Sequence, residues 1–197
     1  MIFGRRKRNP PAPYPAGRPY SSPPGGRRRQ LVPHPIRRIY IPLPVLEATD
    51  KAMRRFGEEY RECYVWWGGY FTTDGDAQVV TALCPDISTE FGHIHLSNRE
   101  LSVLHERLRS LDQVLVAELH THPPGAGGQN EVDAANPAAT YRGFISIVVP
   151  NFAAPRFHDL RQTYVYEYIQ SGEWRELTPP EVEMRFVVEE PFISVRV

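Results

Sequence analysis

The chain has 197 residues, enough for one domain with an extension, and its 23 Lys and Arg balance its 23 Asp and Glu at pH 7. Two cysteines, Cys63 and Cys84, are too few for a disulfide framework and favour reduced thiols in a cytoplasmic protein. No stretch approaches the length of a membrane span, and no apolar segment follows the N-terminal arginines, which excludes a secretory signal.

Basic residues and prolines are concentrated at the N-terminus. Residues 1–38 carry ten Lys and Arg, nine of the 20 prolines and no acidic residue, which leaves 13 basic against 23 acidic residues in the rest of the chain. Such a segment cannot bury enough apolar surface to fold, so we predict a disordered basic arm over residues 1–38. Its basic clusters at 5–8 and 27–29 suit contact with nucleic acid, anionic lipid or an acidic partner. A solvated tail lying on the acidic body fits them at least as well.

The body that follows alternates helical and strand patterns. Apolar spacing and turn residues predict a strand at 36–44, a helix at 46–60, strands at 63–71, 78–84 and 92–97, a helix at 98–111, a strand at 114–122, a short helix at 132–139, a strand at 144–149, and a hairpin of 163–169 with 173–177. Thr49 or Asp50 is the expected cap of the first helix, and Ser97 with Glu100 forms a capping box for the second. Residues 179–197 fit a short helix and a strand equally well.

This mixed order of helices and buried strands predicts an α+β fold, close to α/β. We expect a single domain over residues 39–178 and a C-terminal extension at 179–197. The run from Val114 to Ala117 is apolar at every position, which is typical of a strand in the centre of a sheet.

The same strand ends in His120-Thr-His122-Pro123, a glycine-rich turn and Asp133. Side chains alternate along a strand, so His120 and His122 point to one face, where two imidazoles can hold one divalent metal. Asp133 can return across the turn as a third ligand. Two His and one carboxylate leave one coordination position open, which is the pattern of a catalytic zinc site with one Zn²⁺ per chain.

Three further polar residues need an interpretation. His93-Ile-His95 has the same spacing but lacks the proline, the glycine turn and a well-placed downstream Asp, so we interpret this pair as structural. Glu118 is expected to point to the same face of the strand as His120 and His122. It either contributes to the metal site, directly or through a ligand, or is a structural or solvent-facing acid.

The pattern resembles the signature of the JAMM metalloproteases of the JAB/MPN family. That signature is a distant Glu, then His-x-His-Pro, six residues, a Ser, two residues and an Asp. Four positions match it in kind and spacing: His120, His122, Pro123 and Asp133. The Ser position falls on Asn130, and the resemblance covers roughly residues 45–175.

The family's upstream Glu ends a helix and enters a strand, in a segment like Glu-x-Cys-Gly-Leu-Leu-Leu-Gly. Here Glu62 has the matching distance to Gly69, although its Cys is shifted by one position and the first Gly is replaced. Glu58 and Glu59 are the alternatives nearby. The resemblance implies one MPN/JAB-type domain with a mixed, curved sheet flanked by helices. It also implies that Glu62 is the catalytic base and that Asn130, in place of Ser, helps to stabilise the oxyanion.

Members of that family hydrolyse peptide or isopeptide bonds after the C-terminal Gly of ubiquitin or ubiquitin-like proteins, and many compact prokaryotic members act beside activating and conjugating enzymes. The resemblance therefore implies a deubiquitinase-like isopeptidase, with a ubiquitin-like protein and its conjugates as partners. Two alternatives remain open. One is a processing peptidase for a sulfur-carrier-like or other small substrate, and the other is a non-catalytic MPN scaffold, which the full set of metal ligands argues against.

Overall fold

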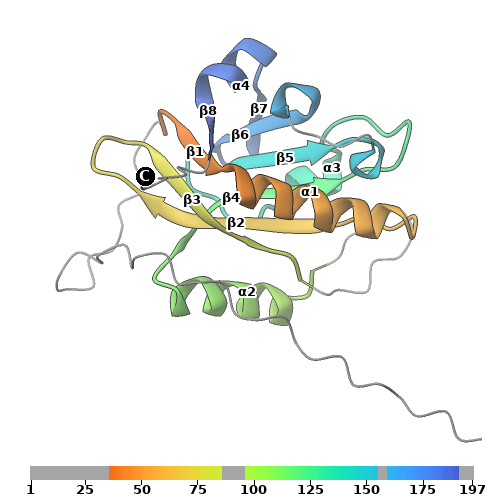
Figure 1. The fold of residues 1–197 in the computed structure, drawn as a ribbon, viewed down its shortest axis with the longest axis horizontal. Helices are drawn as coiled ribbons and strands as arrows, with labels where there is room; N and C mark the ends of the chain where they lie inside the picture. The colour runs from red at the N-terminus through yellow and green to blue at the C-terminus, as the bar shows by residue number, and fades with distance from the viewer. Residues whose placement is uncertain (1–35, 86–95, 155–158, 191–197) are drawn as a thin grey trace, which may run out of the picture.

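The computed structural model describes residues 36–85, 96–154 and 159–190, and within these ranges it confirms the predicted α+β fold. One curved sheet of eight strands carries helices on both faces (Figure 1). The strands lie in the order β7-β6-β5-β4-β2-β3-β1-β8. Their bounds are β1 (Ile39–Pro42), β2 (Tyr64–Phe71), β3 (Ala77–Leu83), β4 (Val114–Thr121), β5 (Ile145–Val149), β6 (Tyr164–Gln170), β7 (Glu173–Glu176) and β8 (Phe186–Glu189).

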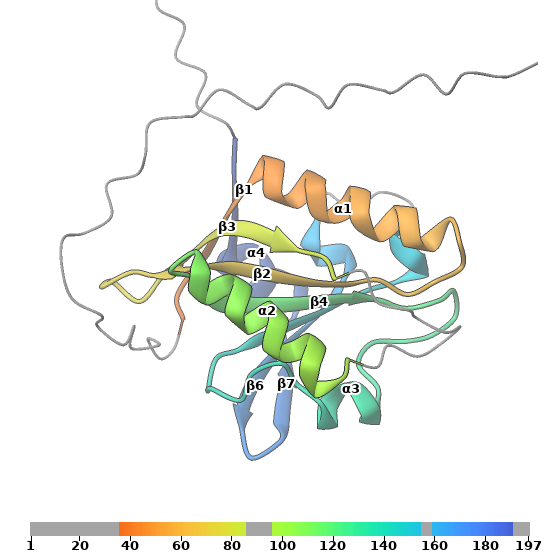
Figure 2. The ribbon, with the colours of Figure 1, turned by 90° about the horizontal axis from the view of Figure 1, so that it is seen from below.

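The two long helices cover different faces of the sheet (Figure 2). The α-helices of the described residues are α1 (Leu43–Gly57), α2 (Asn98–Ser110), α3 (Glu131–Ala135) and α4 (Pro179–Arg185). Leu46 and Met53 of α1 belong to the larger core cluster, whereas Leu104 and Leu108 of α2 pack with Trp66 in a second cluster. Burial on both faces explains why the central strands are apolar at nearly every position.

The candidate site is built on β4, in the middle of the sheet. This strand pairs antiparallel with β2 and parallel with β5, and seven of its eight residues are buried. Its register with β2 places His120 opposite Tyr64 and Glu118 opposite Trp66. Buried polar side chains at the end of an apolar strand are unusual, and each of them needs a partner for its polar atoms.

The first helix begins earlier than the sequence predicts. It starts at Leu43, with Pro44 in the first turn, where no backbone donor is needed. Thr49 and Asp50 lie buried inside the helix, so their prediction as caps is wrong. Thr49 Oγ1 instead accepts a hydrogen bond from Trp67 Nε1 at 2.9 Å, which joins α1 to β2.

The two ends of the described chain both contribute to the folded body. Ile36 is fully buried, and the Arg37 N–H donates to Gly75 O at 2.9 Å, so the body begins before β1. At the other end, the segment that fits both helix and strand contains one of each, α4 and β8, and β8 pairs in parallel with β1.

Some predictions fall on residues that the structure does not describe. The strand expected at 92–97, with His93 and His95, lies mostly outside the described residues, as do residues 1–35 of the predicted arm. None of the helices in the described ranges is both long enough and apolar enough to cross a membrane.

Candidate metal centre

Three side chains from the end of β4 and from α3 converge on one point. The Nε2 atoms of His120 and His122 are 3.2 Å apart, and Asp133 Oδ2 lies 3.4 Å from the first and 3.2 Å from the second. Both imidazoles are buried, and the Asp133 side chain is 19% exposed. Among the described residues, this is the one group of three or more His, Cys, Asp or Glu side chains arranged to hold a metal ion.

The size of this triangle fits a tetrahedral ion. Zinc bonds of about 2.0–2.1 Å place two ligands of a tetrahedron about 3.3–3.4 Å apart. The three separations of 3.2, 3.2 and 3.4 Å are close to that length. Imidazole also suits zinc better than it suits magnesium or calcium. The residues present therefore fit one Zn²⁺ and leave a fourth position for a small ligand.

The backbone of both histidines is held by neighbouring strands. The His122 N–H donates to Val149 O at 2.9 Å, and the His122 carbonyl accepts from the Phe152 N–H at 2.8 Å. His120 lies between Tyr64 of β2 and Val148 of β5. The sheet therefore fixes the backbone position of each histidine, from which its imidazole ring extends. A site on rigid strands holds its geometry better than a site on a loop.

A hydrogen bond on the far side of its ring orients His122. Its Nδ1 lies 3.1 Å from Gly127 O, and because a carbonyl oxygen only accepts, Nδ1 carries the proton and Nε2 faces the centre. Burial opposes a positive charge on His122, but its hydrogen bonds to Asp133 and Gly127 outweigh burial and raise its pKa. A proton therefore competes with a metal ion for this imidazole at a higher pH than usual.

The carboxyl group of Asp133 is held in its ionised form. Burial acts to raise its pKa, but hydrogen bonds with His120 and His122, and one from the Asn130 N–H, hold the pKa well below its usual range. A metal ligand must be deprotonated, so this setting prepares the carboxylate for coordination.

Asn130 and Asp133 together form the start of α3. Asn130 Oδ1 accepts from the N–H groups of Val132 and Asp133 at 2.8 and 3.0 Å, and Asp133 Oδ2 accepts from the Asn130 N–H at 2.9 Å. Because of this capping box, the helix predicted at 132–139 instead begins at Glu131 and is shorter. Asn130 thus places Asp133, while the side-chain nitrogen of Asn130, Nδ2, takes no part in the cap.

The glycine-rich turn between His122 and α3 packs on β6. A Cβ atom on Gly128 would collide with the Tyr166 hydroxyl, and the neighbouring Gln129 N–H donates to that hydroxyl at 3.1 Å. Gly125 has a φ of 84°, in the left-handed region that glycine adopts without strain. These glycines allow the chain to return from His122 to α3 close to the sheet.

Glu118 lies two residues before His120 on β4 and is only 3% exposed. Its Oε2 accepts from the Tyr64 hydroxyl at 2.6 Å and from the Ala138 N–H at 2.9 Å. Burial raises the pKa of Glu118, although these hydrogen bonds oppose the rise. Ala138 follows α3, so Glu118 joins the strand of the histidines to the segment that carries Asp133. Tyr64 belongs to no motif in the sequence, because its position beside Glu118 depends on strand pairing.

Glu62 precedes β2 and is only 6% exposed. The next residue, Cys63, donates from its N–H to Thr121 Oγ1 at 2.8 Å and accepts from the Thr121 N–H at 3.0 Å. Thr121 lies between the two histidines, and Glu62 is close enough to His122 for its charge to favour a protonated imidazole and raise that pKa. Glu62 is therefore buried in the neighbourhood of His122, whereas both neighbouring acids considered as alternatives are exposed.

The chain is similar to a protein named as a probable metalloprotease. No protein-family model matches the chain. The chain is 27% identical over 146 residues to a protein of Sinorhizobium fredii named probable metalloprotease y4jG. The aligned region covers 72% of this chain and 88% of the relative.

The fold is shared with a solved structure. The solution structure of a protein from Desulfitobacterium hafniense covers 78% of this chain and 94% of its own, with a TM-score of 0.55. The sequence identity is 15%, so this likeness concerns the fold alone.

Proposed function

We propose that this protein is a zinc-dependent peptidase of the JAMM type. The main support for this function is the convergence of His120, His122 and Asp133. The distances of 3.2–3.4 Å between their Nε2 and Oδ2 atoms fit a tetrahedral ion with one position open. The similarity to a protein named probable metalloprotease supports a hydrolase of the same broad class. The match to the JAMM signature, including Glu62, supports the narrower type.

The residues around the centre have separate tasks in this chemistry. Zn²⁺ bound there would supply a water molecule whose pKa is lowered towards neutrality. Glu62, buried near His122, takes a proton from the attacking water and delivers it to the leaving amine. Asn130 Nδ2, which lies outside the helix cap, donates to the carbonyl oxygen as negative charge develops on it.

The proposed substrate is the C-terminal tail of a ubiquitin-like protein, cleaved directly after its terminal Gly. This assignment is supported by the resemblance of the motif. An extended tail can add a strand to a sheet edge through main-chain hydrogen bonds, and small residues avoid crowding a buried centre. Within the described residues β3 pairs with β1 only at Ala77 and Gln78, which leaves the rest of that edge for such a strand.

Metal content and cleavage should be measured on protein purified without chelators. We expect about one zinc per chain in the wild type and in Glu62→Gln, and far less in His122→Ala and Asp133→Ala. A ubiquitin-like domain fused to a reporter should be cut after its terminal Gly, as mass spectrometry reveals directly. Glu62→Gln should lose roughly 10²–10⁴-fold in rate because it lacks the base. The matched control is Glu59→Gln, an exposed acid that pairs with Arg61 and should retain activity.

Each alternative outcome has a different meaning. Equal zinc in the wild type and His122→Ala would contradict the ligand assignment. If zinc-loaded protein cleaves only short peptides or small fusions, the processing peptidase replaces the ubiquitin-like substrate. If zinc-loaded protein cleaves nothing, the non-catalytic scaffold becomes the better description.

A further inference from the structure

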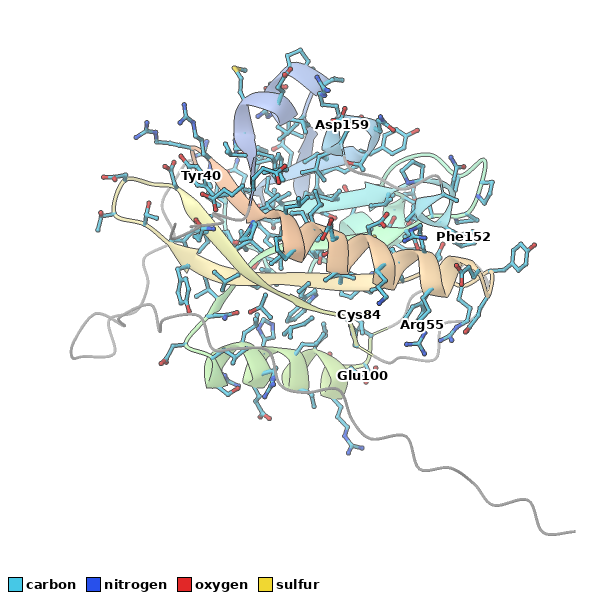
Figure 3. The ribbon with its side chains drawn as sticks, viewed as in Figure 1. Tyr40, Arg55, Cys84, Glu100, Phe152 and Asp159 are labelled. Carbon is cyan, nitrogen blue, oxygen red and sulfur yellow. The ribbon has the colours of Figure 1, made fainter. Side chains whose placement is uncertain are left out.

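Two thiols lie in contact beside the strand end that carries Glu62. Cys63 precedes β2 and Cys84 follows β3, and their Sγ atoms are 3.6 Å apart. These strands pair antiparallel with Trp66 opposite Leu83, so the two cysteines lie at the same end of the pair. Cys63 is fully buried, whereas Cys84 is exposed where β3 ends (Figure 3).

We propose that Cys63 and Cys84 are a site of reversible oxidation, which forms an intramolecular disulfide when the protein meets a peroxide. The sulfur atoms must approach from 3.6 Å to about 2.05 Å, a movement of about 1.5 Å that two side chains can share. One thiol is accessible to an oxidant and the other lies within reach of it, which is the arrangement of an attacked and a resolving cysteine. This geometry holds whether or not the protein is a peptidase.

The reaction consumes one molecule of hydrogen peroxide. The Cys84 sulfur attacks the peroxide O–O bond and becomes a sulfenic acid, and one water molecule leaves. The Cys63 sulfur then attacks the Cys84 sulfur, an S–S bond forms, and the sulfenic hydroxyl leaves as a second water molecule with the Cys63 proton. The two thiols together lose two protons and two electrons, which reduce the peroxide to water.

The environments of the two thiols set the order of these steps. The hydrogen bond with Cys84 and burial both raise the pKa of Cys63, which makes Cys63 the poorer nucleophile towards an external oxidant. Oxidation of Cys84 removes the thiol–thiol hydrogen bond that raises the pKa of Cys63, and it creates an electrophilic sulfur beside Cys63.

The disulfide would join β2 to β3 next to Glu62. The Cys63 backbone is hydrogen-bonded to Thr121 through both its N–H and its carbonyl, so any backbone movement must come mainly from the end of β3. Closing the loop between the two cysteines restricts the unfolded chain, which should raise Tm by roughly 5–10 °C. Neither cysteine is a proposed zinc ligand, so the zinc content should stay constant.

The wild-type protein, with its metal, is treated with a small excess of hydrogen peroxide and compared with an untreated sample. We expect a monomer that is lighter by about 2 Da, has no titratable thiol after denaturation, and returns to its first mass with dithiothreitol. Digestion without reduction should yield a peptide pair joined through Cys63 and Cys84.

Cys63→Ala is the matched variant, because it retains the accessible thiol but removes the resolving one. In this variant the oxidised protein should carry a sulfenic or higher acid on Cys84, or form dimers joined through it. Two results in the wild type would overturn the site. One is a sulfinic acid on Cys84 beside a reduced Cys63, and the other is survival of both thiols at a peroxide dose that oxidises Cys63→Ala.

Discussion

Glu118→Leu should loosen the connection between the two histidines and the segment that carries Asp133. The change removes the acceptor for the Tyr64 hydroxyl and for the Ala138 N–H. A buried donor left without an acceptor costs about 1–3 kcal/mol, so two such donors cost about 2–6 kcal/mol. The Glu118 carboxyl group is desolvated because it is buried, which also raises its pKa, and leucine recovers part of that cost. We expect a net loss of about 2–4 kcal/mol, or roughly 5–15 °C in Tm.

The same change should weaken metal binding. The Ala138 N–H and the bond from Trp174 Nε1 to Ala134 O, at 3.1 Å, both hold the region of α3 that positions Asp133. Losing an interaction that supports a ligand commonly lowers metal affinity about 10–100-fold. Competition for zinc against a chromogenic chelator measures the affinity, and thermal unfolding of the metal-free protein measures the stability.

Glu118→Gln is the matched control. Its side-chain oxygen can accept from both Tyr64 and Ala138, so its zinc affinity should stay within about threefold of the wild type. If Glu118→Leu is destabilised as expected but binds zinc like the wild type, Glu118 supports the fold and not the centre. If Glu118→Gln is as weak as Glu118→Leu, the charge matters more than the hydrogen bonds, and the reasoning from acceptors is refuted.

Asn130→Ala should lose about 1 kcal/mol in thermal unfolding, whereas Asn130→Ser should lose less than about 0.5 kcal/mol because Ser also caps helices; full hydrolysis by the Ser variant would show that the amide is not required. Deletion of residues 1–35 should leave Tm nearly unchanged, whereas deletion of residues 1–38 also removes the buried Ile36 and should cost about 2–4 kcal/mol; equal Tm values would show that Ile36 contributes nothing. Because the pKa of His122 is raised and only neutral imidazole binds metal, zinc affinity should fall as the pH drops through that pKa. Calorimetry in buffers of different protonation enthalpy should detect the released proton, and a constant affinity across this range would refute the shift.

The three proposed ligands could be selected from the sequence because their arrangement is mostly local. Alternation along β4 is enough to put His120 and His122 on one face, and the capping box of Asn130 and Asp133 is written into the sequence after the glycine turn. The structure brings these atoms to 3.2–3.4 Å, and contacts from β2, β5 and β6 hold the backbone around them.

The remaining contacts depend on the register of distant strands. The pairing of Glu118 with Tyr64 follows from the alignment of β2 with β4, which shifts between Trp67 and Gly68 in a way that no local pattern predicts. The contact of Cys63 with Cys84 likewise depends on how β2 aligns with β3. The start of α1 was predicted too late because proline can end a strand and can also occupy the first turn of a helix, as Pro44 does.

The electrostatics of the centre explain how it can keep its shape before a metal arrives. Two imidazoles and a carboxylate within 3.4 Å stabilise one another, since Asp133 favours a protonated His122 and the histidines favour an ionised Asp133. Metal binding is then an exchange of an ion for a proton in a triangle that already has the required size. The two hydrophobic clusters of the described residues supply the main driving force for folding. Three protein ligands with one open position match the pattern of a catalytic rather than a structural zinc site, in agreement with the function proposed above.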